Sequence, residues 1–180
     1  MVSGTPAQQH VRADMGDWIK YGALGGLIAG IVFAMFEMIM AAIMNGGDAF
    51  FMPLRMIGAM VLGQDALVPT YDLLTAAVVG LVVHMMLSII FGIVFGVVVA
   101  LVPTLAESTG ALIVSASAYG FLIWLVNFYI IARIAGWNWF PDQTNVAVQF
   151  VAHTFLFGTV LGWVLERAVA PRRSQSVARE

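Results

Sequence analysis

The 180-residue chain has no cysteine and few charged residues. Without cysteine it can form neither a disulfide scaffold nor a thiolate metal site, and it has no cysteine nucleophile. Only 10% of its residues are charged, against roughly 25% in an average soluble domain, which is too little polar surface for a water-soluble globule of this size. Basic residues do not outnumber acidic ones, 8 against 10, so the chain lacks the electrostatic signature of a nucleic-acid-binding protein.

Apolar sequence is what the chain has in abundance, with 61% hydrophobic residues and a mean hydropathy of +0.94. A helix needs about 20 mostly apolar residues to cross a hydrocarbon core of roughly 30 Å. We therefore predict an all-α, polytopic membrane protein, with a polar N-terminal arm at 1–17 and a basic tail at 169–180 that leaves the helix at Pro171. Four stretches meet the length requirement, at residues 18–44, 73–102, 110–134 and 146–168.

The transmembrane domain, residues 18–168, contains an internal repeat. In its two halves, 18–102 and 110–168, Gly30 aligns with Gly120, and His84 aligns with His153. Each histidine is followed by two glycines four residues apart, a spacing that lets membrane helices approach closely. These matches predict two pseudo-repeated helical hairpins, related by an axis along the membrane normal. The glycines themselves predict a bundle that is closed in its cytoplasmic half.

The distribution of positive charge predicts the orientation. Positive residues concentrate on the cytoplasmic side of inner-membrane proteins, and six of the eight lie on the side of the two termini. Only Arg55 and Arg133 lie in the opposite loops. We expect a multi-pass protein of the cell (inner) membrane with both termini in the cytoplasm. The six residues on the side of the termini are Arg12, Lys20, Arg167, Arg172, Arg173 and Arg179.

Polar residues interrupt all four predicted helices at a similar depth, in the half away from the termini. Glu37 and His84 each share a helix face with glycines, and such faces pack against protein, so both side chains should point inward. His153 continues a polar row with Gln149 one turn earlier. We predict an internal polar cluster near the outer leaflet, made of Glu37, His84, Asn127, Gln149 and His153.

One explanation of this cluster is structural. A carboxyl or imidazole group in the membrane has to be paired, hydrated or neutral. Glu37 hydrogen-bonded to His84 would lock two helices in register, with His153 held by a carbonyl group or by Asn127. The chain would then be a four-helix protein without a ligand.

A second explanation is a bound cofactor. Two histidines on pseudo-symmetric helices, His84 and His153, could ligate a haem b, with Arg55 and Arg133 binding its propionates. Glu37 together with the same histidines could instead hold a transition metal. Copper(I) is the metal that thioethers favour, and methionines recur at helical spacing in the first half of the chain. They are Met40, Met44, Met52, Met56, Met60 and Met85.

Transport is a further function that is compatible with the sequence. Glu37 and His84 could form part of an ion, proton or solute path, because intramembrane ionisable residues often serve transport. Nucleophile elbows, phosphate loops and zinc-protease helices are absent, so no enzymatic reaction is predicted.

The segment 53–62 predicts a short interfacial or re-entrant helix in the first outer loop. The lipid bilayer is the expected partner, and the sequence favours a ligand-binding or accessory subunit of a membrane complex, or a homo-oligomer.

Overall fold

The computed structural model describes residues 14–177, with side chains up to Ala170. Within that range all regular structure is helical, and four segments are long and apolar enough to cross a membrane. The prediction of an all-α polytopic protein is therefore confirmed. The four segments are α1 (Met15–Asn45), α3 (Leu73–Leu101), Thr109–Ala135 and Val146–Ala170.

The third and fourth spans each contain a π-helical segment. The third consists of α4 (Thr109–Val126), the π-helical η4 (Asn127–Ile131) and α5 (Ala132–Ala135). The fourth consists of α7 (Val146–Val151), the π-helical η5 (Ala152–Thr159) and α8 (Val160–Val177).

The last helix is longer than predicted. Because α8 runs to Val177, the expected helix end at Pro171 is wrong. A proline removes one backbone N–H, and the neighbouring helical hydrogen bonds can continue the helix past it. At the other end, α1 takes up residues 15–17 of the expected polar arm. The rest of the arm, residues 1–13, and residues 178–180 of the tail lie outside the described residues.

Each span begins at a side chain that caps its first turn. Asp14, Asp72 and Ser108 accept hydrogen bonds from backbone N–H groups three residues later, at 2.7, 2.7 and 3.1 Å. Asn145 accepts two bonds, from the backbone N–H groups two and three residues later, at 3.0 and 3.1 Å. The first N–H groups of a helix have no partner within the helix, so these acceptors fix where each span starts. Hydrogen bonding to Thr75 lowers the pKa of Asp72 below its ordinary value.

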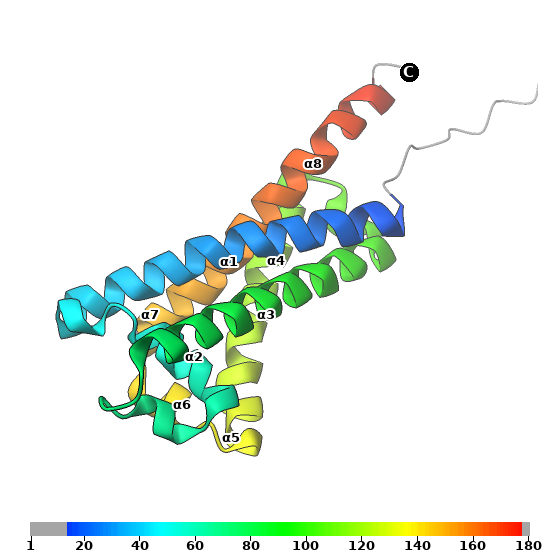
Figure 1. Cartoon of the computed structure of the whole chain (residues 1–180). Helices are drawn as coiled ribbons and strands as arrows, with labels where there is room; N and C mark the ends of the chain where they lie inside the picture. The colour runs from blue at the N-terminus through cyan, green and yellow to red at the C-terminus, as the bar shows by residue number, and fades with distance from the viewer. Residues whose placement is uncertain (1–13, 178–180) are drawn as a thin grey trace, which may run out of the picture.

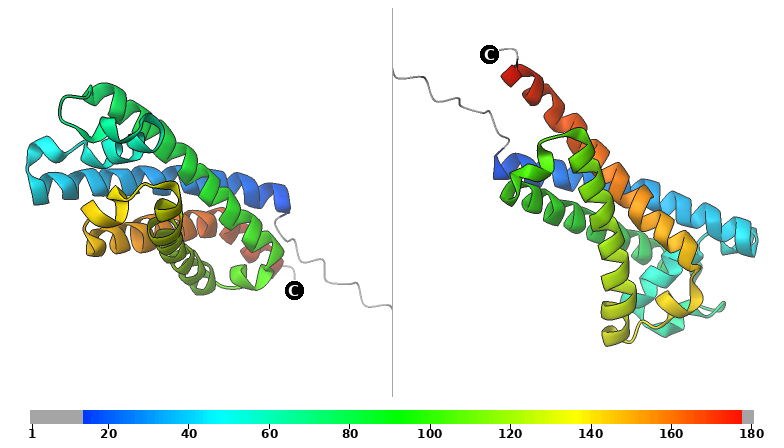
Figure 2. Two further views of the ribbon diagram at one scale, coloured as in Figure 1. Left: turned by 90° about the horizontal axis from the view of Figure 1, so that it is seen from below. Right: turned by 180° about the vertical axis from the view of Figure 1, so that it is seen from behind.

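The described ends of the chain lie together, at the end of the bundle opposite to most of the loops (Figure 1). We call this the termini end and the other the loop end. Figure 2 shows the C-terminal part of α1 gathered at the loop end with the short helices of the first and third loops. These short helices are η1 (Gly47–Ala49), α2 (Met52–Leu62), η2 (Gln64–Leu67) and α6 (Trp139–Gln143), whereas η3 (Pro103–Ala106) lies at the termini end. Which end faces the cytoplasm stays a prediction.

The predicted helix of the first outer loop is α2, and it folds back against the protein. Leu54, Met56 and Ala59 are buried, and a Cβ atom on Gly58 or Gly80 would collide with the backbone of the facing helix, α3 or α2. Trp139 of α6 donates a hydrogen bond from Nε1 to the Met56 carbonyl oxygen at 3.0 Å. α2 and α6 are thus joined over the loop end.

Glycines bring α1 and α3 into backbone contact toward the termini end. A Cβ atom on Gly92 would lie 2.7 Å from the Gly26 Cα atom, and one on Gly30 would lie 2.6 Å from the Ser88 Cβ atom. The second hairpin is equally tight, since a Cβ atom on Gly158 would lie 2.8 Å from the Ser117 Cα atom. Large buried side chains fill the remaining space at this end. The fully buried ones are Phe95, Val99, Leu112, Leu161 and Leu165.

This packing predicts that Gly92→Ala destabilises the protein. The added methyl group has to push α1 and α3 apart, and overpacking of this kind costs about 1–3 kcal/mol. The midpoint of thermal unfolding in detergent should fall accordingly. Gly110→Ala is the matched control, because a Cβ atom at Gly110 has no neighbour within 4 Å. Equal midpoints for the two variants would contradict the packing described.

Candidate functional site

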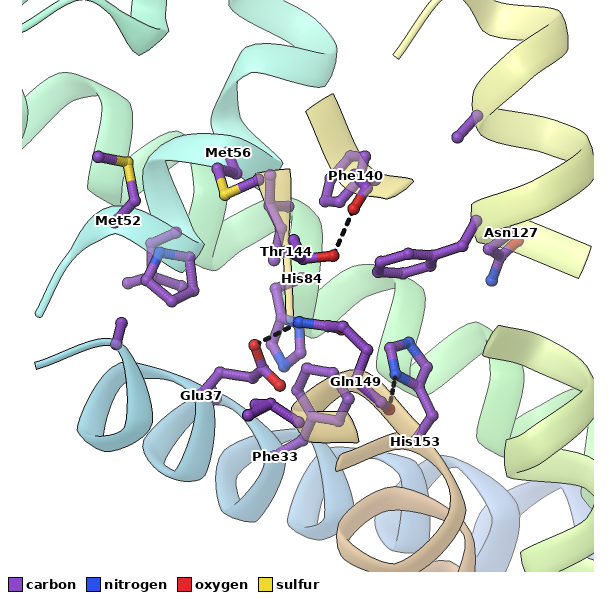
Figure 3. A pocket seen from close by; sticks show the side chains of 18 of the residues that line it. Phe33, Glu37, Met52, Met56, His84, Asn127, Phe140, Thr144, Gln149 and His153 are labelled. Atoms are coloured by element: carbon purple, nitrogen blue, oxygen red, sulfur yellow. Dashed lines mark hydrogen bonds between the residues drawn. The ribbon is translucent and has the colours of Figure 1, made fainter. Parts of the chain in front are cut away.

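A cavity of about 580 Å³ lies toward the loop end, bounded by all four spans. Residues of α1 and α3 form one side, η4 and the fourth span form the other, and α2 and α6 contribute the loop-end wall. Most of its surface is apolar. The predicted polar residues Glu37, His84, Asn127, Gln149 and His153 all line it, and Figure 3 shows them with part of the wall.

Glu37 and Gln149 form the central polar contact of this cavity. Gln149 donates a hydrogen bond from Nε2 to Glu37 Oε2 at 2.7 Å, which joins α1 to the fourth span across 112 positions of sequence. Glu37 is 7% exposed and Gln149 is 6% exposed. The second carboxyl oxygen, Glu37 Oε1, is buried without a hydrogen-bond partner among the described residues. One half of this carboxyl group is therefore free to receive a donor from a ligand.

His84 does not pair with Glu37, so the hydrogen bond expected in the structural explanation is wrong. Its Nε2 atom lies 2.9 Å from the Gly30 carbonyl oxygen instead. Gly30 has no side chain, which lets α3 come so close to α1 that the imidazole reaches the backbone. Because a carbonyl oxygen only accepts, His84 Nε2 carries the hydrogen.

His153 is held by a carbonyl group, as one alternative predicted. Its Nδ1 atom donates to the Gln149 carbonyl oxygen at 2.9 Å. The Phe33 ring contacts both imidazoles, at centroid distances of 5.3 Å to His84 and 4.7 Å to His153. Ligating one iron through both imidazoles would require Phe33 to move and His84 to give up its bond to Gly30. The resting geometry therefore does not present a facing pair of haem ligands.

The remaining predicted site residues lie apart from this group. Figure 3 shows Asn127 on η4, away from Glu37. Neither arginine lines the cavity. Arg55 is buried and donates to the Tyr71 carbonyl oxygen at 2.9 Å, and Arg133 forms a salt bridge with Asp142 at 2.7 Å. Both guanidinium groups bind residues at the loop end, and neither lines the cavity.

Metal ligation finds little support in this arrangement. Among the side chains that the structure describes, residues 14–170, no three of His, Asp or Glu lie close enough together to hold a metal ion. Five methionines do line the cavity, two on α1 and three on α2. They are Met40, Met44, Met52, Met56 and Met60.

Aromatic side chains are the part of the site that sequence reasoning missed. The rings of Phe128 and His153 meet in a T-shaped arrangement at a centroid distance of 5.4 Å, and Phe33 contacts both histidines. Aromatic residues occur throughout the apolar spans, so their sequence positions carried no signal that six of them surround one space. The six are Phe33, Phe91, Phe128, Trp137, Phe140 and Phe157.

The Glu37–Gln149 contact predicts a specific pattern of stabilities. Gln149→Leu leaves the buried carboxyl group without a protein partner and should lower the free energy of unfolding by about 1–2 kcal/mol. Adding Glu37→Leu removes the carboxyl group that Gln149→Leu leaves unpaired, so the double variant should be more stable than Gln149→Leu alone. Thermal unfolding of the two single variants and the double variant measures the coupling. Purely additive effects would show that the two side chains do not interact.

Comparison of the chain with protein-family models, with curated proteins and with solved structures found no match. The functional conclusions below therefore rest on the geometry of the site.

Proposed function

We propose that the protein is a membrane protein that binds a small, largely apolar organic molecule in the loop-end cavity. The cavity itself carries this proposal. Its volume, about 580 Å³, falls within the range of roughly 300–1,000 Å³ that is typical of ligand sites. Mostly apolar walls with a few converging polar groups are equally typical of such sites.

The polar groups favour a bound molecule over a purely structural role. A cluster that only joined helices would be expected to satisfy all its buried atoms, because an unpaired polar atom in the membrane is costly. Glu37 is buried, at 7% exposure, and its Oε1 atom has no partner among the described residues. A donor on a ligand would satisfy it.

An organic ligand fits these residues better than haem or a metal ion. Phe33 contacts both imidazoles, and His84 and His153 each use one nitrogen to bind a backbone carbonyl group. Neither Arg55 nor Arg133 lines the cavity, so neither is placed to bind propionates. Membership in a larger membrane complex and the inner-membrane location stay predictions.

Transport is a second candidate function, which the π-helical segments favour. Asn127 and His153, both cavity residues, lie in η4 and η5. π-Helical insertions in α-helices occur frequently at functional sites. If the cavity is part of a proton path, proteoliposomes should acidify faster than protein-free vesicles after an external acid pulse. Glu37→Gln should abolish the difference, and an unaffected flux would remove Glu37 from the path.

Filling the cavity tests the proposed binding function. The uncharged probe 1-naphthalenemethanol should bind the purified protein in nanodiscs. Leu87→Trp, which adds volume to a lining residue, should weaken that binding at least about tenfold, or 1.4 kcal/mol. Met86→Trp is the control, because Met86 is the neighbouring residue, is 51% exposed and does not line the cavity. Equilibrium dialysis gives both affinities, and equal losses in the two variants would argue against the cavity as the binding site.

A further inference from the structure

The charges around the loop-end cavity are of one sign. Its lining residues, all within the described part of the chain, include one carboxylate and no lysine or arginine. The carboxylate is Glu37, whose Oε1 atom is buried and unpartnered. A carboxylate in a membrane interior is stabilised by a positive charge nearby, and the protein places none among these residues. The missing positive charge would have to come from the ligand.

Hydrogen-bonding capacity points in the same direction. His84 Nε2 and His153 Nδ1 donate to backbone carbonyl groups, and Gln149 Nε2 donates to Glu37. In a neutral imidazole the other ring nitrogen is an acceptor, so each histidine has only an acceptor left. Together with Glu37 Oε1, the polar group shown in Figure 3 offers a ligand three acceptors. Other lining groups, such as the Asn127 amide and the Ser88 hydroxyl, can donate or accept, and the Trp137 indole N–H can only donate.

The walls of the cavity suit a cation with an apolar body. The faces of aromatic rings carry negative electrostatic potential and attract ammonium groups within about 6 Å. Six aromatic residues line the cavity, and Phe33 lies next to Glu37 in Figure 3. The methionine side chains are flexible and polarizable, which lets them adapt to ligands of different shape.

We propose that the ligand is an organic monocation that carries N–H donors on an apolar body, that is, a protonated lipophilic amine bound with its ammonium group at Glu37. This inference rests on the proposed binding function and names its ligand class. One carboxylate matches one positive charge. An anionic ligand would be repelled by the Glu37 carboxylate and by the negative potential of the ring faces. A neutral ligand would leave the charge of the carboxylate without a counter-charge.

A series of probes with one apolar body tests the proposal. The probes are 1-naphthylmethylamine, which is an ammonium ion at pH 7, its N,N,N-trimethyl derivative, 1-naphthalenemethanol and 1-naphthylacetate. Binding is measured by equilibrium dialysis to the full-length protein in nanodiscs of phosphatidylcholine, with empty nanodiscs subtracted. The primary ammonium ion should bind at least about tenfold more tightly than the alcohol, and the carboxylate most weakly. The trimethyl derivative has the charge without N–H donors and should bind more weakly than the primary ammonium ion.

Variants assign this preference to Glu37. Glu37→Gln should reduce the affinity for the ammonium ion to that for the alcohol, and measurable binding of the alcohol to the variant reports an intact cavity. Glu107→Gln makes the same change of net charge at an exposed residue that follows η3 and does not line the cavity, so it should leave all affinities unchanged. If Glu37→Gln does not fold, the order of affinities in the unmodified protein still decides whether a cation is preferred.

The outcomes separate this inference from the proposed function. If none of the probes binds, both the proposed binding function and the inference fail. If the alcohol binds as tightly as the ammonium ion, or if the preference for the ammonium ion survives Glu37→Gln, the cavity binds apolar molecules but the proposed cation site is wrong. A trimethyl derivative that binds as tightly as the primary amine would overturn the role of the three acceptors.

Discussion

Close contact between helix backbones at glycine is the constraint on which the rest of the structure depends. In lipid, helices gain little from the hydrophobic effect, and packing at short range replaces it. Gly26 and Gly30 of α1 lie against Ser88 and Gly92 of α3. Further toward the loop end, Gly80 of α3 lies against Leu54 of α2 instead. α3 thus changes its partner from α1 to α2 along its length.

This change of partner is what leaves space for the cavity. α1 continues past Gly30 to Asn45 without a glycine contact to α3, and the side chains on one of its faces, from Phe33 to Asn45, line the cavity. The second hairpin closes the opposite side, held together where Gly158 meets Ser117. Tight packing at the termini end and a cavity at the loop end are therefore two consequences of where the glycines lie.

The polar residues then determine the chemistry of the cavity. His84 reaches the Gly30 carbonyl oxygen because the helices are close at that glycine, and Gln149 reaches Glu37 because the fourth span crosses α1 at this depth. The bond to Gly30 leaves His84 with an acceptor nitrogen, and the bond from Gln149 leaves Glu37 Oε1 as an unpaired acceptor. The carboxylate therefore has no positive charge beside it, and the acceptors around it have no donors. These missing partners are the basis for the proposed ligand.

The sequence by itself determined the four spans, the helix in the first loop and the polar residues that line the cavity. Apolar length and helical periodicity are local properties, and residues such as Glu37 and His84 share a face with glycines whatever their partners are. Only the tertiary structure decided the pairing: Glu37 with Gln149, His84 with Gly30, and Phe33 with both imidazoles. The reason is physical. Which side chains meet depends on how the helices cross and rotate, and small shifts between packed helices exchange one hydrogen-bond partner for another.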